Sequence, residues 1–224
     1  RVRGGLRRDH AKMSAMESPL IRRVTALDLA LVRRPWPFAD ARRAEIDAHF
    51  AEQQRLKPHL WNGRVLLGRD PVFAGDRLSA SYFETDFASF LAWRDWGFPD
   101  KEVFNGFGMG ALLASDGAFV CGVMGEQTAN AGRIYFPSGT PDLDDVRDGT
   151  LDIPGSVVRE LEEETGLSPA DYSAEADWHC VVTGSALAMI QILNLDMPGE
   201  AARARIEANL ADQDEPELSA IHLV

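Results

Sequence analysis

One stretch of the sequence decides how the rest is interpreted: Arg159-Glu160-Leu161-Glu162-Glu163-Glu164-Thr165-Gly166-Leu167. The spacing of the apolar residues predicts a helix from about Ile153 to Thr165. Asp152 can accept hydrogen bonds from the free amides of the first turn, and Pro154 is tolerated there because its missing donor would be unpaired. Gly166 suits the left-handed residue that commonly ends a helix.

Three glutamates share one face of this predicted helix. Glu160, Glu163 and Glu164 stand three and four positions apart, whereas Glu162 points elsewhere. Each like-charged neighbour pair costs roughly 0.2 to 0.5 kcal/mol even when exposed. A hard divalent cation would compensate, because Mg²⁺ or Mn²⁺ prefers carboxylate oxygens, and it would neutralise and orient a pyrophosphate for attack by water. Arg159, four residues before Glu163, can hold that carboxylate in an ion pair.

The order of residue types in 159–167 resembles the Nudix box, whose second half is Arg-Glu-aliphatic-any-Glu-Glu-any-Gly-aliphatic, and all nine positions fit. The resemblance covers about Phe104 to Val224. It implies an α/β/α sandwich around a mixed sheet, and a metal-dependent hydrolase of nucleoside diphosphates linked to another group. It makes Glu160, Glu163 and Glu164 metal ligands, the last two also catalytic, and gives Arg159 a structural role.

The first half of the box departs from the family pattern. The expected glycine falls on Asp145, and the expected glutamate falls on Leu151. Gly139, which precedes an acidic loop, resembles the displaced glycine, with an insertion between it and the helix. We expect its backbone carbonyl to face the metal.

The resemblance also implies a further carboxylate from outside the box, acting as base or ligand. Glu215 and Glu217 are the candidates, although residues of this type in a polar segment are more often solvated. His179 lies in an apolar strand pattern, which favours a core histidine over a catalytic base.

Two short segments carry a fainter similarity, to a Nudix branch that cleaves UDP-sugars. They are Asn62-Gly63-Arg64, after Leu60-Trp61, and Asp86-Phe87 with Phe90 and Arg94-Asp95. A nucleotide sugar is therefore the first substrate expected, ahead of ADP-ribose, dinucleotides or a nucleoside triphosphate. Tryptophans such as Trp61, Trp93 and Trp96 can stack a base, but aromatic residues in this number usually belong to a core.

Helical and strand patterns alternate along the chain, which predicts an α/β protein. We expect a disordered lead-in over 1–16, accessory helices and strands over 17–103, and the hydrolase domain over 104–224. Asp116-Gly117 marks a tight hairpin. The expected helices are 38–54, 86–96, 153–165 and 200–211, and the expected strands are 64–67, 78–83, 106–113, 118–124, 133–136, 178–182, 187–195 and 218–224.

Composition limits the possible partners. The 224 residues include 35 Asp and Glu against 23 Lys and Arg, a formal net charge of -12, which disfavours nonspecific nucleic-acid binding. Cys121 and Cys180 lie in apolar runs, so we expect buried free thiols and a cytoplasmic location. The longest apolar run, 186–195, is too short for a membrane span. A small nucleotide diphosphate is the expected partner, and a homodimer stays open.

Three classes of function remain. The first is a Mg²⁺-dependent (or Mn²⁺-dependent) pyrophosphohydrolase. The second is a non-catalytic nucleotide-binding or regulatory module, motivated by the absent glutamate at Leu151. The third is a scaffold whose acidic, solvated helix contacts a partner and binds no metal.

Overall fold

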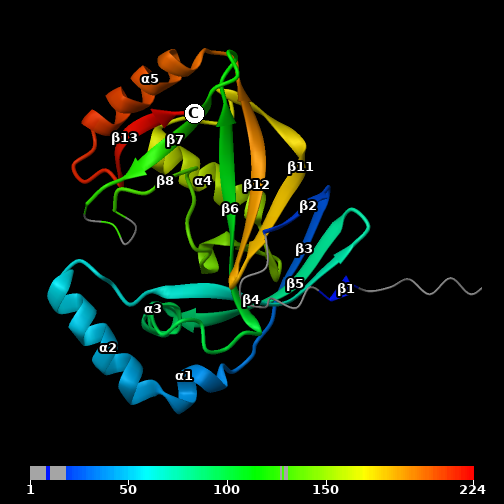
Figure 1. The fold of residues 1–224 in the computed structure, drawn as a ribbon, viewed down its shortest axis with the longest axis vertical. Coiled ribbons are helices and arrows are strands. Elements are labelled where there is room, and N and C mark those ends of the chain that lie inside the picture. The colour runs from blue at the N-terminus through cyan, green and yellow to red at the C-terminus, as the bar shows by residue number, and fades with distance from the viewer. Residues whose placement is uncertain (1–8, 11–18, 127, 129–130) are drawn as a thin grey trace, which may run out of the picture. The chain divides into compact units, whose positions relative to one another are not determined.

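The computed structural model describes residues 9–10, 19–126, 128 and 131–224 (Figure 1). The chain forms two compact units. Unit 1 comprises Arg1–Gly106, Asp142–Leu151 and Cys180–Leu187, and unit 2 comprises Phe107–Pro141, Asp152–His179 and Ala188–Val224. The predicted lead-in, 1–16, lies outside the described residues except for β1 (Asp9–His10).

Unit 1 is built on a mixed sheet. Strand β5 pairs antiparallel with β4, from Arg64↔Asp86 to Ala74↔Arg77, and parallel with β3, from Ala26↔Arg77 to Leu31↔Tyr82. This confirms the predicted α/β class with a mixed sheet. The elements lying wholly in unit 1 are β1 (Asp9–His10), β2 (Leu20–Val24), β3 (Ala26–Leu31), α1 (Pro37–Ala41), α2 (Arg43–Leu56), β4 (Arg64–Ala74), β5 (Arg77–Asp86), α3 (Phe87–Asp95), a 3₁₀ turn (Leu143–Asp145), β9 (Val146–Arg147) and β10 (Thr150–Leu151).

Aromatic side chains dominate the core of unit 1. Trp93 is fully buried, and its ring lies 6.1 Å from Trp36 and 4.8 Å from Phe98. Burying rings of this size supplies much of the stability of a small core. The buried Arg69 guanidinium pairs with Asp100 at 2.6 Å, and the Trp36 indole donates to the same carboxylate at 2.9 Å.

Several features of unit 1 differ from the sequence-based expectation, among them the unpredicted strands β2 and β3. The helix expected over 38–54 is interrupted at Arg42, whose guanidinium lies 4.3 Å above the Trp96 ring, a tertiary contact with no local signal. Strand β4 continues past Pro71 because a register shift after Arg69 accommodates the proline. Trp61 is 80% exposed, so the expectation of a core tryptophan is wrong there.

Unit 2 has β7 at the centre of its antiparallel pairings. Strand β7 pairs with β6 (Leu112↔Val120), with β13 (Ile221↔Gly122) and with β8 (Gly122↔Tyr135). Helix α5 packs on β13 and β7. The elements lying wholly in unit 2 are β7 (Phe119–Met124), β8 (Ile134–Tyr135), α4 (Ile153–Thr165), α5 (Gly199–Ala211) and β13 (Leu218–Leu223), and those contributing to both units are β6 (Val103–Leu113), β11 (Tyr172–Thr183) and β12 (Ala186–Leu195).

Local predictions hold well in unit 2. The hairpin between β6 and β7 turns at Gly117, which has a φ of +90°. Asp116 does not share that conformation and instead accepts the amide of Gly199 through its carboxylate, at 3.1 Å. Cys121 and Cys180 are buried and free, as expected. Among the helices described, none is long and apolar enough to cross a membrane.

Candidate metal centre

Helix α4 begins and ends where the sequence predicts. The Asp152 carboxylate accepts the amide of Gly155 at 3.0 Å, and Gly166 adopts the left-handed conformation at φ +71°. A side chain at position 155 would collide with the capping carboxylate, because its Cβ would lie 2.4 Å from Asp152 Oδ2. Capping at both ends therefore fixes the 13 residues that carry the glutamates.

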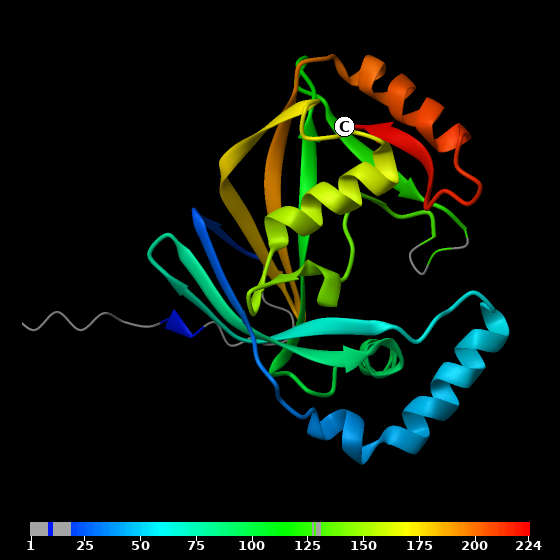
Figure 2. The ribbon, with the colours of Figure 1, turned by 180° about the vertical axis from the view of Figure 1, so that it is seen from behind.

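Helix α4 crosses β6 in the view of Figure 2, and glycines in β6 let the helix approach this strand closely. A Cβ at Gly108 would lie 2.6 Å from Val157 Cγ2, and one at Gly110 would lie 3.2 Å from Val157 Cγ1. At its other end the helix is held by Gln213, whose side-chain amide donates to the Glu163 carbonyl at 3.1 Å. The spacing of Gly108 and Gly110 was a sequence signal for this close packing that the predictions did not use.

The three glutamates differ sharply in exposure although they share one helix. The Glu163 side chain is 62% exposed and that of Glu160 is 17% exposed, whereas Glu164 is buried. Glu162, which was predicted to lie off the shared face, is exposed. The spacing correctly grouped the carboxylates, but it did not reveal that one of them lies in the apolar face beside Leu161.

Glu164 is the most perturbed carboxyl group of the site. Its Oε2 has no hydrogen-bond partner, and the backbone amide of Ser138 donates to the group. Burial, followed by the charges of Glu217 and Glu160, raises the pKa of Glu164 to about 8. An unpartnered buried oxygen costs free energy unless a proton or a cation satisfies it.

Gly139 lies against the carboxylate of Glu160. A Cβ at this position would lie 2.5 Å from Oε1 of Glu160, so a larger residue there would require the Glu160 carboxylate to move. Its neighbour Ser138 supplies the amide that bonds Glu164. The turn before the acidic loop therefore contacts two of the three glutamates through residues 138 and 139. The predicted metal-binding role of the Gly139 carbonyl stays a prediction.

The two carboxylates proposed from outside the helix are placed differently. Glu217 precedes β13, its carbonyl accepts the amide of Gly125 at 2.8 Å, and its charge acts on Glu164. Glu215 is exposed in the preceding loop and is not among the groups that raise the pKa of Glu164. The structure thus brings Glu217, but not Glu215, to the α4 carboxylates.

Arg159 bridges two of the helix glutamates. Its Nη1 lies 3.5 Å from Glu163 Oε2, which agrees with the predicted ion pair, and 2.9 Å from Glu160 Oε1, which the helical spacing did not predict. Glu164 stands outside this bridge: Arg159 is not among the groups acting on it.

The donor set suits a hard divalent cation. The charges of three carboxylates act on Glu164, which itself has an oxygen without a partner, and Gly139 lies against the carboxylate of Glu160. Within the part of the chain that the structure describes, no three His, Cys, Asp or Glu side chains converge closely enough to hold a metal as they stand. The chemistry of the residues therefore fits a cation, while the side-chain positions need adjustment.

The departures at Asp145 and Leu151 have a structural cause. The segment Asp142–Leu151 belongs to unit 1, where Thr150 of β10 pairs with Ala30 of β3. Asp145 is buried and accepts the amide of Asp142 at 3.0 Å, and Leu151 is buried as a core residue. The segment that the sequence suggested to be an acidic loop is thus a folded insertion. Asp145 therefore serves as a capping residue and Leu151 as a core residue.

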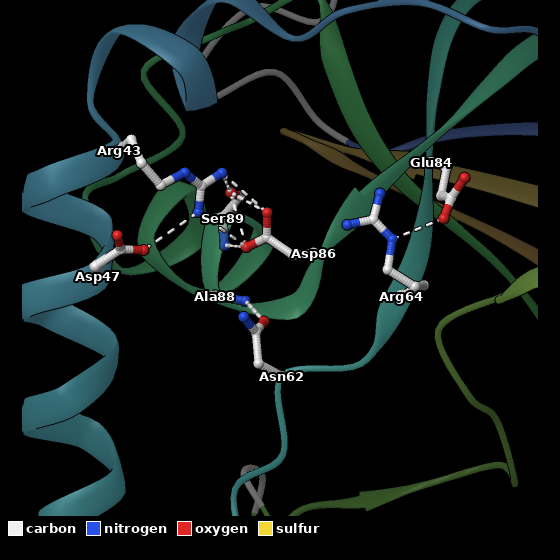
Figure 3. Close-up of polar contacts among 8 residues, drawn as sticks. All are labelled: Arg43, Asp47, Asn62, Arg64, Glu84, Asp86, Ala88 and Ser89. Atoms are coloured by element: carbon white, nitrogen blue, oxygen red, sulfur yellow. Dashed lines mark hydrogen bonds and ion pairs between the residues drawn. The ribbon is translucent and has the colours of Figure 1, made fainter.

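The segments that resemble the UDP-sugar branch meet at the start of α3 (Figure 3). The Asn62 side chain accepts the amide of Ala88 at 2.8 Å, and Asp86 accepts that of Ser89 at 2.9 Å. Arg43 pairs with Asp86 at 2.9 Å. Burial alone would raise the pKa of Asp86, but the bonds from Arg43 and Ser89 hold it below its usual value. The motif therefore caps a helix in unit 1.

His179 is half-buried in β11, so the expectation of a core histidine is only partly met. It is not among the groups that act on Glu164.

Comparisons with known proteins add little to this geometry. No protein-family model matches the chain, and no curated protein matches it. Among solved structures it is similar to the crystal structure of a Nudix hydrolase from M. Smegmatis, RenU, at 13% sequence identity and a TM-score of 0.34. That match covers 53% of this chain and 68% of the other. A likeness of this size carries no argument about function, so the chemistry must follow from the residues of the site.

Proposed function

We propose that this chain is a divalent-metal-dependent hydrolase of a nucleoside diphosphate linked to another group. The observation that carries the proposal is the buried Glu164 carboxylate, which has an unpartnered oxygen and lies close enough to Glu160 and Glu217 for their charges to raise its pKa. Such a cluster is stable only with a proton or a cation, and a pyrophosphate brings oxygens that complete the shell of Mg²⁺ or Mn²⁺.

Each residue has a distinct part in this proposal. Glu160 and Glu164 hold the cation, and Glu163, the exposed member, completes the ligand set. When bound, the cation would neutralise the pyrophosphate and lower the pKa of an attacking water. Glu217 is the candidate base, because it lies near Glu164 yet is exposed to solvent. Ser138 keeps Glu164 oriented through its amide.

A nucleotide sugar is the first substrate proposed, ahead of ADP-ribose, dinucleotides and nucleoside triphosphates. This order rests on the short similarity around Asn62 and Asp86 alone. The proposal includes a small-molecule partner and a cytoplasmic location, without nucleic acid or membrane.

An activity screen tests the proposal. The purified chain is incubated with Mg²⁺ or Mn²⁺ and each substrate class, and nucleoside monophosphate is measured as the product. We expect release from at least one diphosphate, and none with EDTA. Glu200→Gln, on the exposed surface of α5, is the matched control for glutamate variants of α4. Turnover that persists in both Glu160→Gln and Glu164→Gln would remove the proposal.

A specific observation favours a second candidate, a non-catalytic nucleotide-binding module. Leu151 is buried in the core where the family pattern places a glutamate, so that carboxylate is missing. Calorimetry distinguishes the two: nucleotide binding that needs Mg²⁺, with no product from any substrate class, supports the module and excludes the hydrolase.

A further inference from the structure

The C-terminal end of α4 is held by the segment that follows α5. Glu163 lies in the last turn of α4, where backbone carbonyls lack the amides of a following turn. The amide of Leu167, four residues further on, donates instead to the hydroxyl of Thr165 at 3.2 Å. The side-chain amide of Gln213 donates to the Glu163 carbonyl at 3.1 Å and so supplies the missing partner.

A second residue of α5 contacts the same end of α4. Asn209 lies four residues before Gln213, and a Cβ at Gly166 would lie 2.5 Å from Asn209 Oδ1. Gln213 is itself fixed to α5, because its backbone amide donates to the carbonyl of Leu210 at 3.2 Å. The two helices therefore meet through the side chains at 209 and 213, close to Glu163.

The candidate base Glu217 is the next fixed point along this segment. Its carbonyl accepts the amide of Gly125 at 2.8 Å, and β13 begins with the following residue. Residues 214–216 separate it from Gln213, in the short loop that joins α5 to β13 (Figure 1). The place of Glu217, whose charge acts on Glu164, thus depends on how this loop is held at Gln213.

From these contacts we propose that Gln213 is a positioning residue, whose bond to α4 holds Glu217 within reach of Glu164. The inference rests on the proposed function, because Glu217 is the base of that proposal. The alternative is a purely structural role. In that case the loss of Gln213 would lower stability and would change neither the loop nor the chemical step.

Gln213→Met tests this, because it keeps the length of the side chain and removes its donor. Hydrogen exchange in EDTA, followed by nuclear magnetic resonance, needs no metal. We expect the Gly125 amide, which donates to Glu217, to exchange about fivefold faster, because the loop loses one hydrogen bond. With Mg²⁺ and the diphosphate that the wild type hydrolyses fastest, kcat should fall about tenfold at unchanged KM, since a misplaced base affects the transition state alone.

Gln191→Met is the matched control. The Gln191 side-chain amide donates to the backbone carbonyl of Glu175 at 2.8 Å, so the same kind of bond is lost elsewhere in unit 2. Both variants should lose a similar amount of thermal stability, but Gln191→Met should keep kcat and the exchange rate of Gly125. Gln213→Lys retains a donor for a helix carbonyl and should restore both readouts.

A double variant shows whether Gln213 acts through Glu217. Glu217→Gln alone should lower kcat, and the addition of Gln213→Met should lower it no further. A multiplied loss in the double variant overturns the inference.

The same experiments separate this inference from the proposed function. Faster exchange of Gly125 in Gln213→Met, without hydrolysis of any substrate by the wild type, keeps the positioning of Glu217 and removes the hydrolase. Hydrolysis by the wild type, with kcat and exchange unchanged in Gln213→Met, keeps the hydrolase and removes the inference.

Discussion

Two helices of this molecule begin in the same way but differ in how their charged side chains are paired. Helices α3 and α4 are each capped by an aspartate, Asp86 and Asp152. Around the start of α3, every charge meets a partner: Arg43 bonds Asp86 at 2.9 Å, and Asp86 also bonds Ser89. On α4, by contrast, carboxylates outnumber the nearby arginine, and Glu164 keeps an unpartnered oxygen. A satisfied polar network stabilises a fold, whereas an unsatisfied one needs a ligand to complete it.

The largest expected effect is on activity, and it tests whether only the α4 cluster is functional. Glu164→Gln keeps the shape of the side chain but removes a buried ligand charge, so hydrolysis should fall at least about 100-fold. Asp86→Asn, which alters the satisfied cluster, should keep turnover within a few-fold wherever the protein is folded. Initial rates with a saturating substrate measure both. A comparable loss in the two variants would contradict the division of roles.

The next expected effect is on stability. Here the larger loss should come from the charged cluster at the start of α3 and not from the carboxylates of α4. Asp86→Ala removes the cap of α3 and leaves Arg43 without its main partner, so unfolding should need about 2 kcal/mol less. Urea denaturation measures this. Asp47 supplies the control, because it is exposed and lies 3.4 Å from the same arginine. Asp47→Ala should change stability by less than about 0.5 kcal/mol, and an equal loss in both would show that the cap is unimportant.

The stability contributions of Glu164 and Asp86 should depend on pH in opposite ways. The pKa of Glu164 is about 8 in the folded protein and near 4.5 in the unfolded chain, so the folded state binds this proton more tightly. Stability is thus full below about pH 4.5 and decreases as the pH rises through 8. The lowered pKa of Asp86 has the reverse effect, since its contribution persists at high pH and is lost only under strong acidification.

Thermal unfolding in EDTA measures this contrast. At pH 9, Glu164→Gln should melt about 10 °C or more above the wild type. Raising the pKa from about 4.5 to about 8 costs the folded wild type about 5 kcal/mol at about 1.4 kcal/mol per pKa unit, and each kcal/mol is worth about 2–4 °C at this size. At pH 5 the two should agree within about 3 °C, because less than about 1 kcal/mol of this difference is present there. Added Mn²⁺ should raise the wild type at pH 9 and leave the variant unchanged. If the difference in melting temperature between Glu164→Gln and the wild type does not depend on pH, the burial of the side chain and not its charge determines the difference.

The sequence predicted the bounds of helix α4 better than it predicted the residues that surround the helix. Asp152, Pro154 and Gly166 are local signals, and they predicted the helix bounds correctly. The pairing of Thr150 with Ala30 joins segments 120 residues apart. No local sequence signal near either residue predicts this pairing. The burial of Glu164 is likewise set by packing on the sheet, since a helical pattern assigns residues to faces without saying how deep each face lies.

The smallest expected effect asks whether an unpartnered buried oxygen is enough to mark a site. Tyr82 is fully buried in unit 1 and its hydroxyl has no hydrogen-bond partner, yet Phe104 and Gly106 surround it rather than charges. Tyr82→Phe removes an unpaired polar atom and keeps the ring, so stability should stay level or rise by about 1 kcal/mol. Urea denaturation at pH 7 decides, and a clear loss would show that the hydroxyl has a partner. With Glu164 the unpartnered oxygen is accompanied by three further carboxylates, and it is this excess of charge that calls for a cation.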